Sequence, residues 1–210
     1  GRQLEGIPLT DKTALTLYYP HVESNGWWTG IVAYNPSDLA SMISIKPYNA
    51  QGAALPISTD SIAGKAKYVG TVTGLGLPAQ TAWFKIDSTR PLSGFELIST
   101  NDFEQLAAYA GNGWSGSTSG IFPKIEKYGW TTITLVNTED STASVTLTAY
   151  TDAGAVVDTQ VIPIGGHAKY IGQVPASNAS YITYSSNKNI VGAQVNGTAD
   201  WTMLDGLPGM

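Results

Sequence analysis

The two histidines, His21 and His167, are the side chains of this sequence best suited to move protons near neutral pH. Neither lies beside a nucleophile in a recognisable catalytic pattern. The sequence repeats itself after about 100 residues, and His21 then falls near Lys124 while His167 aligns with Lys65. Because neither histidine recurs in the other half, we expect surface or loop roles for both, no catalytic residues and no enzymatic activity.

Four aspartates stand at equivalent points of the two halves, Asp38 with Asp140 and Asp102 with Asp200. Repeated aspartates in turns usually cap backbone N–H groups, although such turns also supply oxygen ligands for calcium. The sequence has no D-x-D-x-D cluster, no opposed carboxylate pair of the glycosidase type and no cysteine. We therefore predict turn chemistry with no metal and no cofactor, and calcium bound in these turns is the alternative.

The segment Gly111–Gly116 matches the G-x-G-x-x-G pattern of phosphate-binding loops. That chemistry needs a strand before the glycines and a helix N-terminus after them. Here Ser117–Gly120 follows and leads into another predicted strand. We interpret the segment as a flexible linker between the two halves.

Aromatic side chains are the strongest candidates for binding. Trp27 and Trp114 have no aromatic counterpart in the other half, since Trp27 aligns with Gly129 and Trp114 lies in the linker. An unmatched tryptophan beside a glycine-rich loop is suited to stack on a sugar ring or a partner, and Thr71–Gln80 is such a loop. It is equally suited to cover a domain junction. Three aromatic pairs recur in both halves, which favours packing: Trp28 with Trp130, Trp83 with Tyr181, and Phe103 with Trp201.

Two long segments, Gly26–Gly52 and Tyr128–Gly154, show the duplication that positions all these residues. In Val145–Tyr150 apolar residues alternate with threonines, as expected of a strand with one buried face. Turn signals recur every 8–12 residues or so without a helical period, which is typical of antiparallel β-sandwiches. We predict an all-β chain of two tandem antiparallel immunoglobulin-like β-sandwich domains, residues 1–108 and 109–210.

The expected strands of the two units follow from this pattern. In the first unit they are Ala14–Tyr19, Thr29–Tyr34, Met42–Tyr48, Lys65–Val72, Thr81–Ile86, Gly94–Ser99 and Phe103–Leu106. In the second they are Gly120–Pro123, Thr131–Val136, Ser144–Tyr150, Val157–Pro163, His167–Ile171, Ala179–Tyr184, Ile190–Asn196 and Trp201–Leu204.

Charge argues against two classes of partner. Charged residues make up only 13% of the chain, and the net charge is −5. Without a basic stripe, nucleic acid is not an expected partner. No apolar run is long enough to cross a bilayer, so we expect no membrane span within this chain.

A set of short motifs runs through both halves: Tyr19-Pro20 and Phe122-Pro123, Trp28-Thr29 and Trp130-Thr131, Asn35-Pro36, Val145–Leu147, Tyr48 and Tyr150, Lys67–Gly70, Gly94–Leu97 and Leu204–Pro208. Together these motifs resemble a tandem immunoglobulin-like repeat, about 100 residues long, of exported bacterial surface proteins. The second half departs from the pattern at Thr138, where the repeat has proline, and at Gln194, where it has glutamate. The resemblance implies a secreted or cell-surface location and transfers no catalytic residue.

The sequence thus predicts a non-enzymatic extracellular module, either a structural spacer or an adhesion and surface-display domain. The alternative is a carbohydrate-binding module that holds a polysaccharide on exposed aromatics, Trp27 and Trp114 above all; a surface protein is the other expected partner. The phrase at Leu4–Pro8 recurs at Leu204–Pro208, which suggests a longer array or a motif that closes each unit. No signal-peptide pattern follows Gly1, so an exported parent is expected to have lost its signal.

Overall fold

The computed structural model describes residues 12–23, 26–102, 104–110, 116–173 and 178–209. All regular structure in these residues is β-strand, and they contain no helix that could span a membrane. The first unit holds β1 (Ala14–Tyr19), β2 (Trp27–Tyr34), β3 (Ser41–Tyr48), β4 (Ser58–Ile62), β5 (Lys67–Thr71), β6 (Trp83–Thr100) and β7 (Leu106–Ala110). The second holds β8 (Ser117–Phe122), β9 (Gly129–Asn137), β10 (Ala143–Tyr150), β11 (Val156–Ile164), β12 (Lys169–Gln173), β13 (Tyr181–Thr198) and β14 (Leu204–Pro208).

Each unit is one seven-stranded antiparallel sheet, and the two sheets share one topology. The strand order is β4-β3-β6-β2-β5 in the first and β11-β10-β13-β9-β12 in the second. In the first sheet β1 and β7 also pair with β6, and in the second β8 and β14 pair with β13. The all-β antiparallel prediction is therefore confirmed, and the duplicated sequence folds into duplicated topology.

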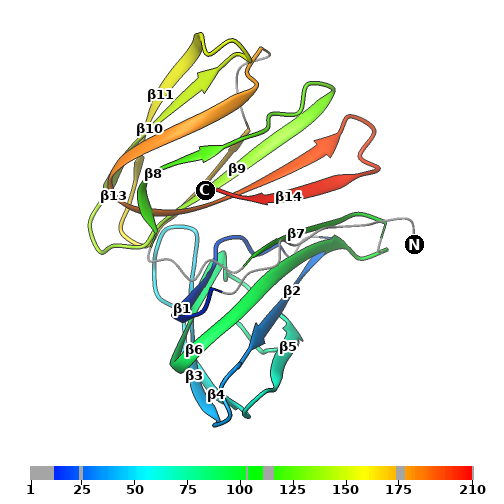
Figure 1. Cartoon of the computed structure of the whole chain (residues 1–210), viewed down its shortest axis with the longest axis vertical. Coiled ribbons are helices and arrows are strands. Elements are labelled where there is room, and N and C mark those ends of the chain that lie inside the picture. The colour runs from blue at the N-terminus through cyan, green and yellow to red at the C-terminus, as the bar shows by residue number, and fades with distance from the viewer. Residues whose placement is uncertain (1–11, 24–25, 103, 111–115, 174–177, 210) are drawn as a thin grey trace.

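The longest strand of each unit makes its sheet curl. The first half of β6 pairs with β1 and β3, whereas its second half pairs with β2 and β7. β13 does the same with β8 and β10 and then with β9 and β14. The sequence predicted two separate strands in each of these places, which is wrong, because one strand of 18 residues crosses both halves of the sheet. Each sheet therefore folds over its own core like half of a barrel (Figure 1).

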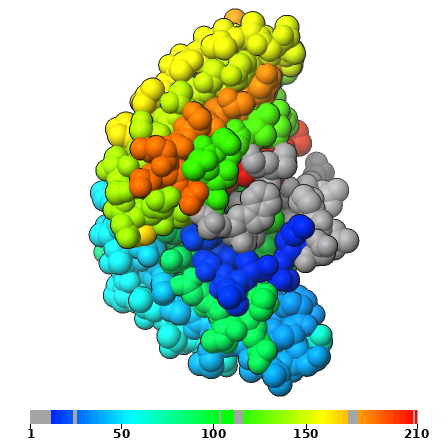
Figure 2. All heavy atoms as spheres, turned by 60° about the vertical axis from the view of Figure 1, so that its left-hand side comes forward, coloured from blue at the N-terminus to red at the C-terminus, as the bar shows by residue number. Residues whose placement is uncertain are grey.

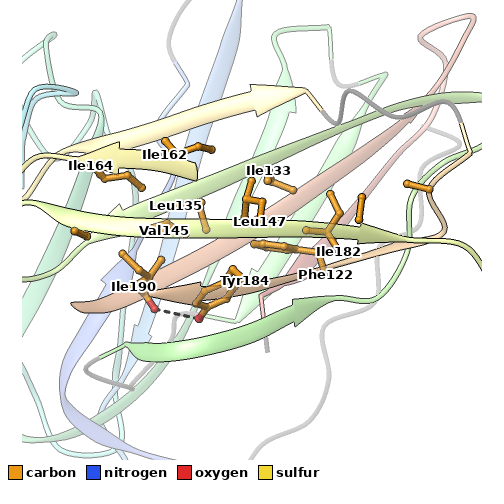
Figure 3. Close-up of a cluster of buried hydrophobic side chains, with 13 residues drawn as sticks. Phe122, Ile133, Leu135, Val145, Leu147, Ile162, Ile164, Ile182, Tyr184 and Ile190 are labelled. Atoms are coloured by element: carbon orange, nitrogen blue, oxygen red, sulfur yellow. Dashed lines mark hydrogen bonds between the residues drawn. The ribbon is translucent and has the colours of Figure 1, made fainter. Parts of the chain in front are cut away.

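Apolar side chains from both halves of each curled sheet fill these cores. Figure 3 shows the second core, in which Leu135, Val145 and Phe122 are completely buried. The Tyr184 hydroxyl lies in the same core, 3.4 Å from the carbonyl oxygen of Ile190. The first core is built in the same way around Leu17, Phe84, Ile86 and Leu92.

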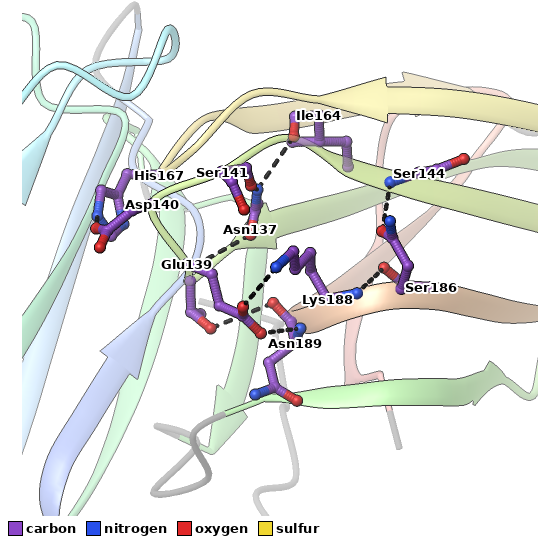
Figure 4. A network of polar contacts seen from close by, with 12 residues as sticks. Asn137, Glu139, Asp140, Ser141, Ser144, Ile164, His167, Ser186, Lys188 and Asn189 are labelled. Atoms are coloured by element: carbon purple, nitrogen blue, oxygen red, sulfur yellow. Dashed lines mark hydrogen bonds and ion pairs between the residues drawn. The ribbon is translucent and has the colours of Figure 1, made fainter.

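A buried asparagine fixes the turn after β2 and after β9. The amide nitrogen of Asn137 donates to the carbonyl oxygens of Ser141, Ile164 and Gly165 at 2.8, 3.1 and 3.0 Å. Asn35 makes the corresponding three bonds in the first unit. Beside Asn137, the Glu139 carboxylate accepts from the backbone N–H of Asn189 and pairs with Lys188 (Figure 4). Satisfied donors explain why an amide is stable at complete burial.

One strand was not expected, and two others begin later than the sequence predicts. The polar strand Ser58–Ile62 was not expected, since its residues show no apolar alternation. The strands expected at 103–106 and 201–204 instead begin at Leu106 and Leu204. Consequently Trp201 lies in the turn before β14 rather than within a strand.

The two units are packed directly against each other. β7 of the first unit lies beside β14 of the second (Figure 1). Gly206 sits so close to the Ala108 backbone that a Cβ there would overlap it. Figure 2 shows the surfaces of the two units in contact over one face of the molecule.

Candidate functional site: a cleft at the junction of the two units

An aromatic cluster forms one end of the junction. Trp83 is 1% exposed and stacks on Tyr48 with ring centroids 4.4 Å apart. Val136 and Val191 of the second unit complete the cluster. The Trp83 Nε1–H donates to the carbonyl oxygen of His167 at 2.8 Å. The largest side chain of this cluster is therefore satisfied only because the second unit is docked.

Backbone contacts continue the junction beside this cluster. Gly52 has a φ of 90°, and a Cβ at this position would overlap the carbonyl oxygen of Gly166. The backbone N–H of Lys169 donates to the carbonyl oxygen of Ala50 at 3.0 Å. The Lys169 ammonium donates to the carbonyl oxygen of Ala82, also at 3.0 Å. A lysine of the second unit thus reaches into the first.

The Lys169 ammonium faces a buried acid of the first unit, Glu96. Burial lowers the pKa of Lys169 to about 8, and the charges of Glu23 and Glu96 oppose that shift. Burial raises the pKa of Glu96 well above its usual range, while Lys169 and the His21 backbone N–H oppose the shift. Neither carboxyl oxygen of Glu96 accepts a hydrogen bond of good geometry. The pair therefore carries a large desolvation cost, which the opposite charges on the two sides of the junction partly offset.

His21 links the two units through its imidazole. Its Nε2 lies 2.9 Å from Oε1 of Glu23, and its Nδ1 lies 3.2 Å from Oγ1 of Thr134. Burial and the nearby Lys169 charge lower the pKa of His21 to about 4, although Glu23 opposes the shift. The neutral ring accordingly donates from Nε2 to Glu23 and accepts at Nδ1 from the Thr134 hydroxyl, a tautomer that we assign from these partners.

A cleft of about 250 Å³ opens beside this polar chain, and both units supply its walls. Most of the lining is apolar, and three of the side chains are indoles. Its rim is exposed at Trp201 and Ile171, whereas Ile98 and Leu204 are buried. The lining residues are His21, Glu23, Trp27, Ile98, Trp130, Thr132, Thr134, Ile171, Val195, Trp201 and Leu204.

Trp201 is held in an unusual conformation at the rim of this cleft. Its φ of 57° lies in the left-handed region, which bulky residues rarely adopt. Asp200 fixes the turn by accepting from the hydroxyls of Thr198 and Thr202 at 2.6 and 2.8 Å. The side-chain amide of Gln105, from the first unit, donates to the Trp201 carbonyl oxygen. The indole is thus presented to solvent, 53% exposed, on a braced turn.

The ring of Trp130 packs against the ring of Trp201. Their ring centroids are 4.8 Å apart with the planes tilted by 33°. The Trp130 ring lies against Gly197, where any Cβ would overlap it. A glycine in β13 therefore makes room for one indole, which in turn supports the other.

The sequence-predicted site residues fall differently on this structure. Trp27 is half-buried, lines the cleft and packs against Ile98 and Ala193 of the two units. Both roles left open for it, at a junction and beside a ligand, are thus compatible with its position. Trp114 lies outside the described residues. The loop 71–80 does not line the cleft, because it turns Val72 and Leu77 into the first core.

The structure places the histidines and the repeated aspartates at the junction and in turns. The expected surface role for His21 is wrong, since this residue is 5% exposed inside the junction. His167 lies in a turn with a φ of 55°, its Nε2 2.8 Å from Asp140. Asp102 and Asp200 accept backbone N–H groups within their turns, as expected. In the turns of Asp38 and Asp140, asparagines 35 and 137 make that bond instead. Across the described part of the chain, no three His, Asp or Glu residues cluster as metal ligands would.

Sequence reasoning missed Glu23, Trp130 and Trp201 as residues of one site. Trp130 and Trp201 recur as aromatics in both halves, and recurrence favoured packing for both. That interpretation is wrong for Trp201, which is exposed at the rim. A usable signal existed in Gly197, next to a threonine-rich turn, because a strand glycine often marks the close approach of another group.

Comparisons with known proteins add little to this picture. No family model and no curated protein matches the chain. Thermotoga maritima 1070 is 17% identical with a TM-score of 0.39, over 46% of this chain and 96% of that one. The Anabaena sensory rhodopsin transducer is 17% identical with a TM-score of 0.32, over 37% and 92%. An allantoicase gives 8% and 0.23, over 84% and 73%. At such low scores these similarities support no inference about fold or function.

Proposed function

We propose that this chain is a non-enzymatic module of an exported protein, in which two immunoglobulin-like sandwich repeats are docked as one rigid pair. The pair acts at the cell surface or in secretion as a spacer that also adheres to a partner. The observation that carries the proposal is the junction itself, where the second unit satisfies the buried Trp83 indole. Freely jointed repeats have no reason to bury such a group between them.

The polar contacts of the junction support the same conclusion. Lys169 and His21 each bond across it, and Gln105 braces the turn of Trp201 from the opposite unit. These bonds have direction as well as energy, so they favour one relative orientation of the units. A spacer with a fixed orientation transmits the position of whatever is attached at either end.

A distance measurement tests rigidity directly. The chain has no cysteine, so Lys67→Cys with Thr159→Cys places one spin label on each unit at exposed positions. Rigid docking predicts a narrow distance distribution by double electron–electron resonance, and Trp83→Ala in the same background predicts a broad one. A broad distribution in the parent pair would refute the rigid spacer. Antibody labelling of intact source cells tests the surface location independently.

A further inference from the structure

We infer that the junction cleft is a carbohydrate-binding site that takes one neutral sugar ring, with Trp201 as the stacking platform and Glu23 as the hydroxyl acceptor. The inference rests on the proposed function in one respect, since it names the ligand through which the module adheres. The juxtaposition that carries it is an exposed, strained tryptophan of one unit that lines the same cleft as a carboxylate of the other unit. The two side chains come from different units, so neither unit alone forms the site.

The apolar walls suit the C–H face of a sugar. Trp201 lies at the exposed rim on its left-handed turn, and Trp27 and Trp130 also line the cleft. Backbone strain retained at an exposed aromatic is a common feature of ligand sites, because the surrounding structure must stabilise it. The cleft volume of about 250 Å³ lies below the ~300–1,000 Å³ typical of drug-sized ligands. One ring therefore fits, with the rest of a glycan extending over the exposed rim.

The polar wall suits hydroxyl groups. Glu23 is half-buried, and its Oε1 is fixed by His21 at 2.9 Å. Its backbone N–H donates to Oγ1 of Thr29 at 2.9 Å, which fixes the loop that presents it. A carboxylate accepts hydroxyl protons, and Thr132, which also lines the cleft, carries a hydroxyl that can donate and accept. Because these groups are already oriented, binding orders few additional side chains.

The charged groups around the cleft favour a neutral sugar over the other ligand classes that bind to aromatic clefts. Among the residues that the structure describes, no lysine or arginine lines the cleft, and His21 is neutral, which disfavours phosphates and acidic sugars. An organic cation is favoured by indoles and a carboxylate. Here, however, Lys169 already acts on Glu23, so the carboxylate is opposed by a positive charge of the protein. A purely apolar ligand would desolvate Glu23 without a hydrogen bond in return.

Binding by the whole chain to an array of neutral and acidic glycans tests the inference, with isothermal titration of the neutral glycans that bind. Trp201→Ala should weaken binding by roughly tenfold or more, since it removes the stacking face. Glu23→Gln should weaken it by a smaller factor, because the amide still accepts one hydroxyl. Tyr128→Ala is the matched control, as Tyr128 is an aromatic of the same unit, 88% exposed and outside the cleft lining. That control should bind like the parent.

Three outcomes overturn the inference. One is an array without a neutral glycan bound; another is binding that survives both cleft variants. The third is saturable binding of choline, included as a methylated-ammonium probe, in the absence of glycan binding. The spin-label distances are measured on the same preparations, so a narrow distribution without glycan binding removes the sugar site and leaves the rigid spacer standing. A broad distribution removes the spacer.

Discussion

Trp83 and Tyr181 begin the same long strand in the two units, yet their surroundings differ. Trp83 is almost completely buried beneath the second unit, whereas Tyr181 is half-buried and stacks on Tyr150 of its own unit. Gly52 touches Gly166, but its equivalent Gly154 has open space around it. The fold alone therefore does not set the role of a residue in this molecule. A position of the first unit that contacts the second unit has a structural role, whereas the equivalent position of the second unit has no such neighbour.

The largest expected effect comes from the aromatic cluster. Trp83→Ala should lower the free energy of unfolding by about 3–5 kcal/mol, because it removes a buried ring and its bond to the second unit. Tyr181→Ala should cost about 1 kcal/mol. Urea denaturation followed by circular dichroism measures both. Equal losses would show that the junction adds nothing to the burial of Trp83.

Exchanging the buried acid and its amide counterpart gives the next effect. In Gln194, the amide donates to the carbonyl oxygen of Lys124 and to Asn196. Gln194→Glu should destabilise the protein by about 2–4 kcal/mol at neutral pH, because it removes both bonds and places an acid at a completely buried position. Denaturation at several pH values measures the loss. An unchanged midpoint at pH 7 would contradict the prediction.

The reverse exchange should stabilise the protein, by an amount that depends on pH. Because the folded-state pKa of Glu96 is raised, the stability it contributes is present in full below about pH 4.5 and is lost as the pH rises. A glutamine does not titrate, so Glu96→Gln removes this pH-dependent loss of stability. The difference in the free energy of unfolding between the variant and the parent should therefore grow from pH 5 to pH 8, reaching about 1 kcal/mol in favour of the variant. A difference in the free energy of unfolding that stays constant from pH 5 to pH 8 would show that ionisation of Glu96 does not destabilise the folded protein.

The two glycine turns should respond differently to a methyl group. Both glycines have positive φ, so alanine costs about 1 kcal/mol of backbone strain in each. Gly52→Ala should cost about 1–3 kcal/mol more, because its Cβ meets the Gly166 backbone. Denaturation gives the energies, and the spin-label distance shows whether the units separate. A Gly154→Ala loss as large as that of Gly52→Ala would argue against tight docking.

The effect that is smallest at neutral pH is the acid sensitivity due to His21. Burial lowers its pKa from 6.5 to about 4, so between these values the unfolded chain binds a proton that the folded chain excludes. Stability should therefore fall as the pH drops from about 6.5 to about 4. The groups that face the ring are Glu23, Lys169 and Thr134, and His21→Asn leaves all three in place. Because asparagine does not titrate, this variant should flatten the dependence of stability on pH between about 4 and 6.5. His167→Asn is the control and should retain it.

Local sequence signals were sufficient for the repeated parts of the fold. The Asn35 and Asn137 turns, the alternation in β10 and the recurrence of most strands in both halves follow from short-range patterns. Strand β4 escaped detection because it lies at a sheet edge and its residues 59–61 are polar and exposed, so that only Ile62 contributes to the core. The two long strands were split in prediction because residues 87–90 and 185–189 in their middle are polar and at most partly buried.

The candidate site was largely beyond the sequence, for a different reason. Trp27 was singled out correctly as unusual, but its neighbours Trp130 and Trp201 come from a second unit whose docking no local pattern encodes. Lys169 illustrates the difficulty. Its equivalent Lys67 lies in the same sequence phrase and is exposed. Only the packing of one unit on the other distinguishes the two lysines.

The tryptophans of the junction also have a spectroscopic consequence. Trp27, Trp83, Trp130 and Trp201 all lie in the aromatic cluster or the cleft. Because these are four of the six tryptophans of the chain, intrinsic emission should report mainly the separation of the two units, whereas the aromatic residues of the two cores are tyrosine and phenylalanine. Emission and far-ultraviolet dichroism, recorded during the same titration, should diverge wherever undocking precedes unfolding.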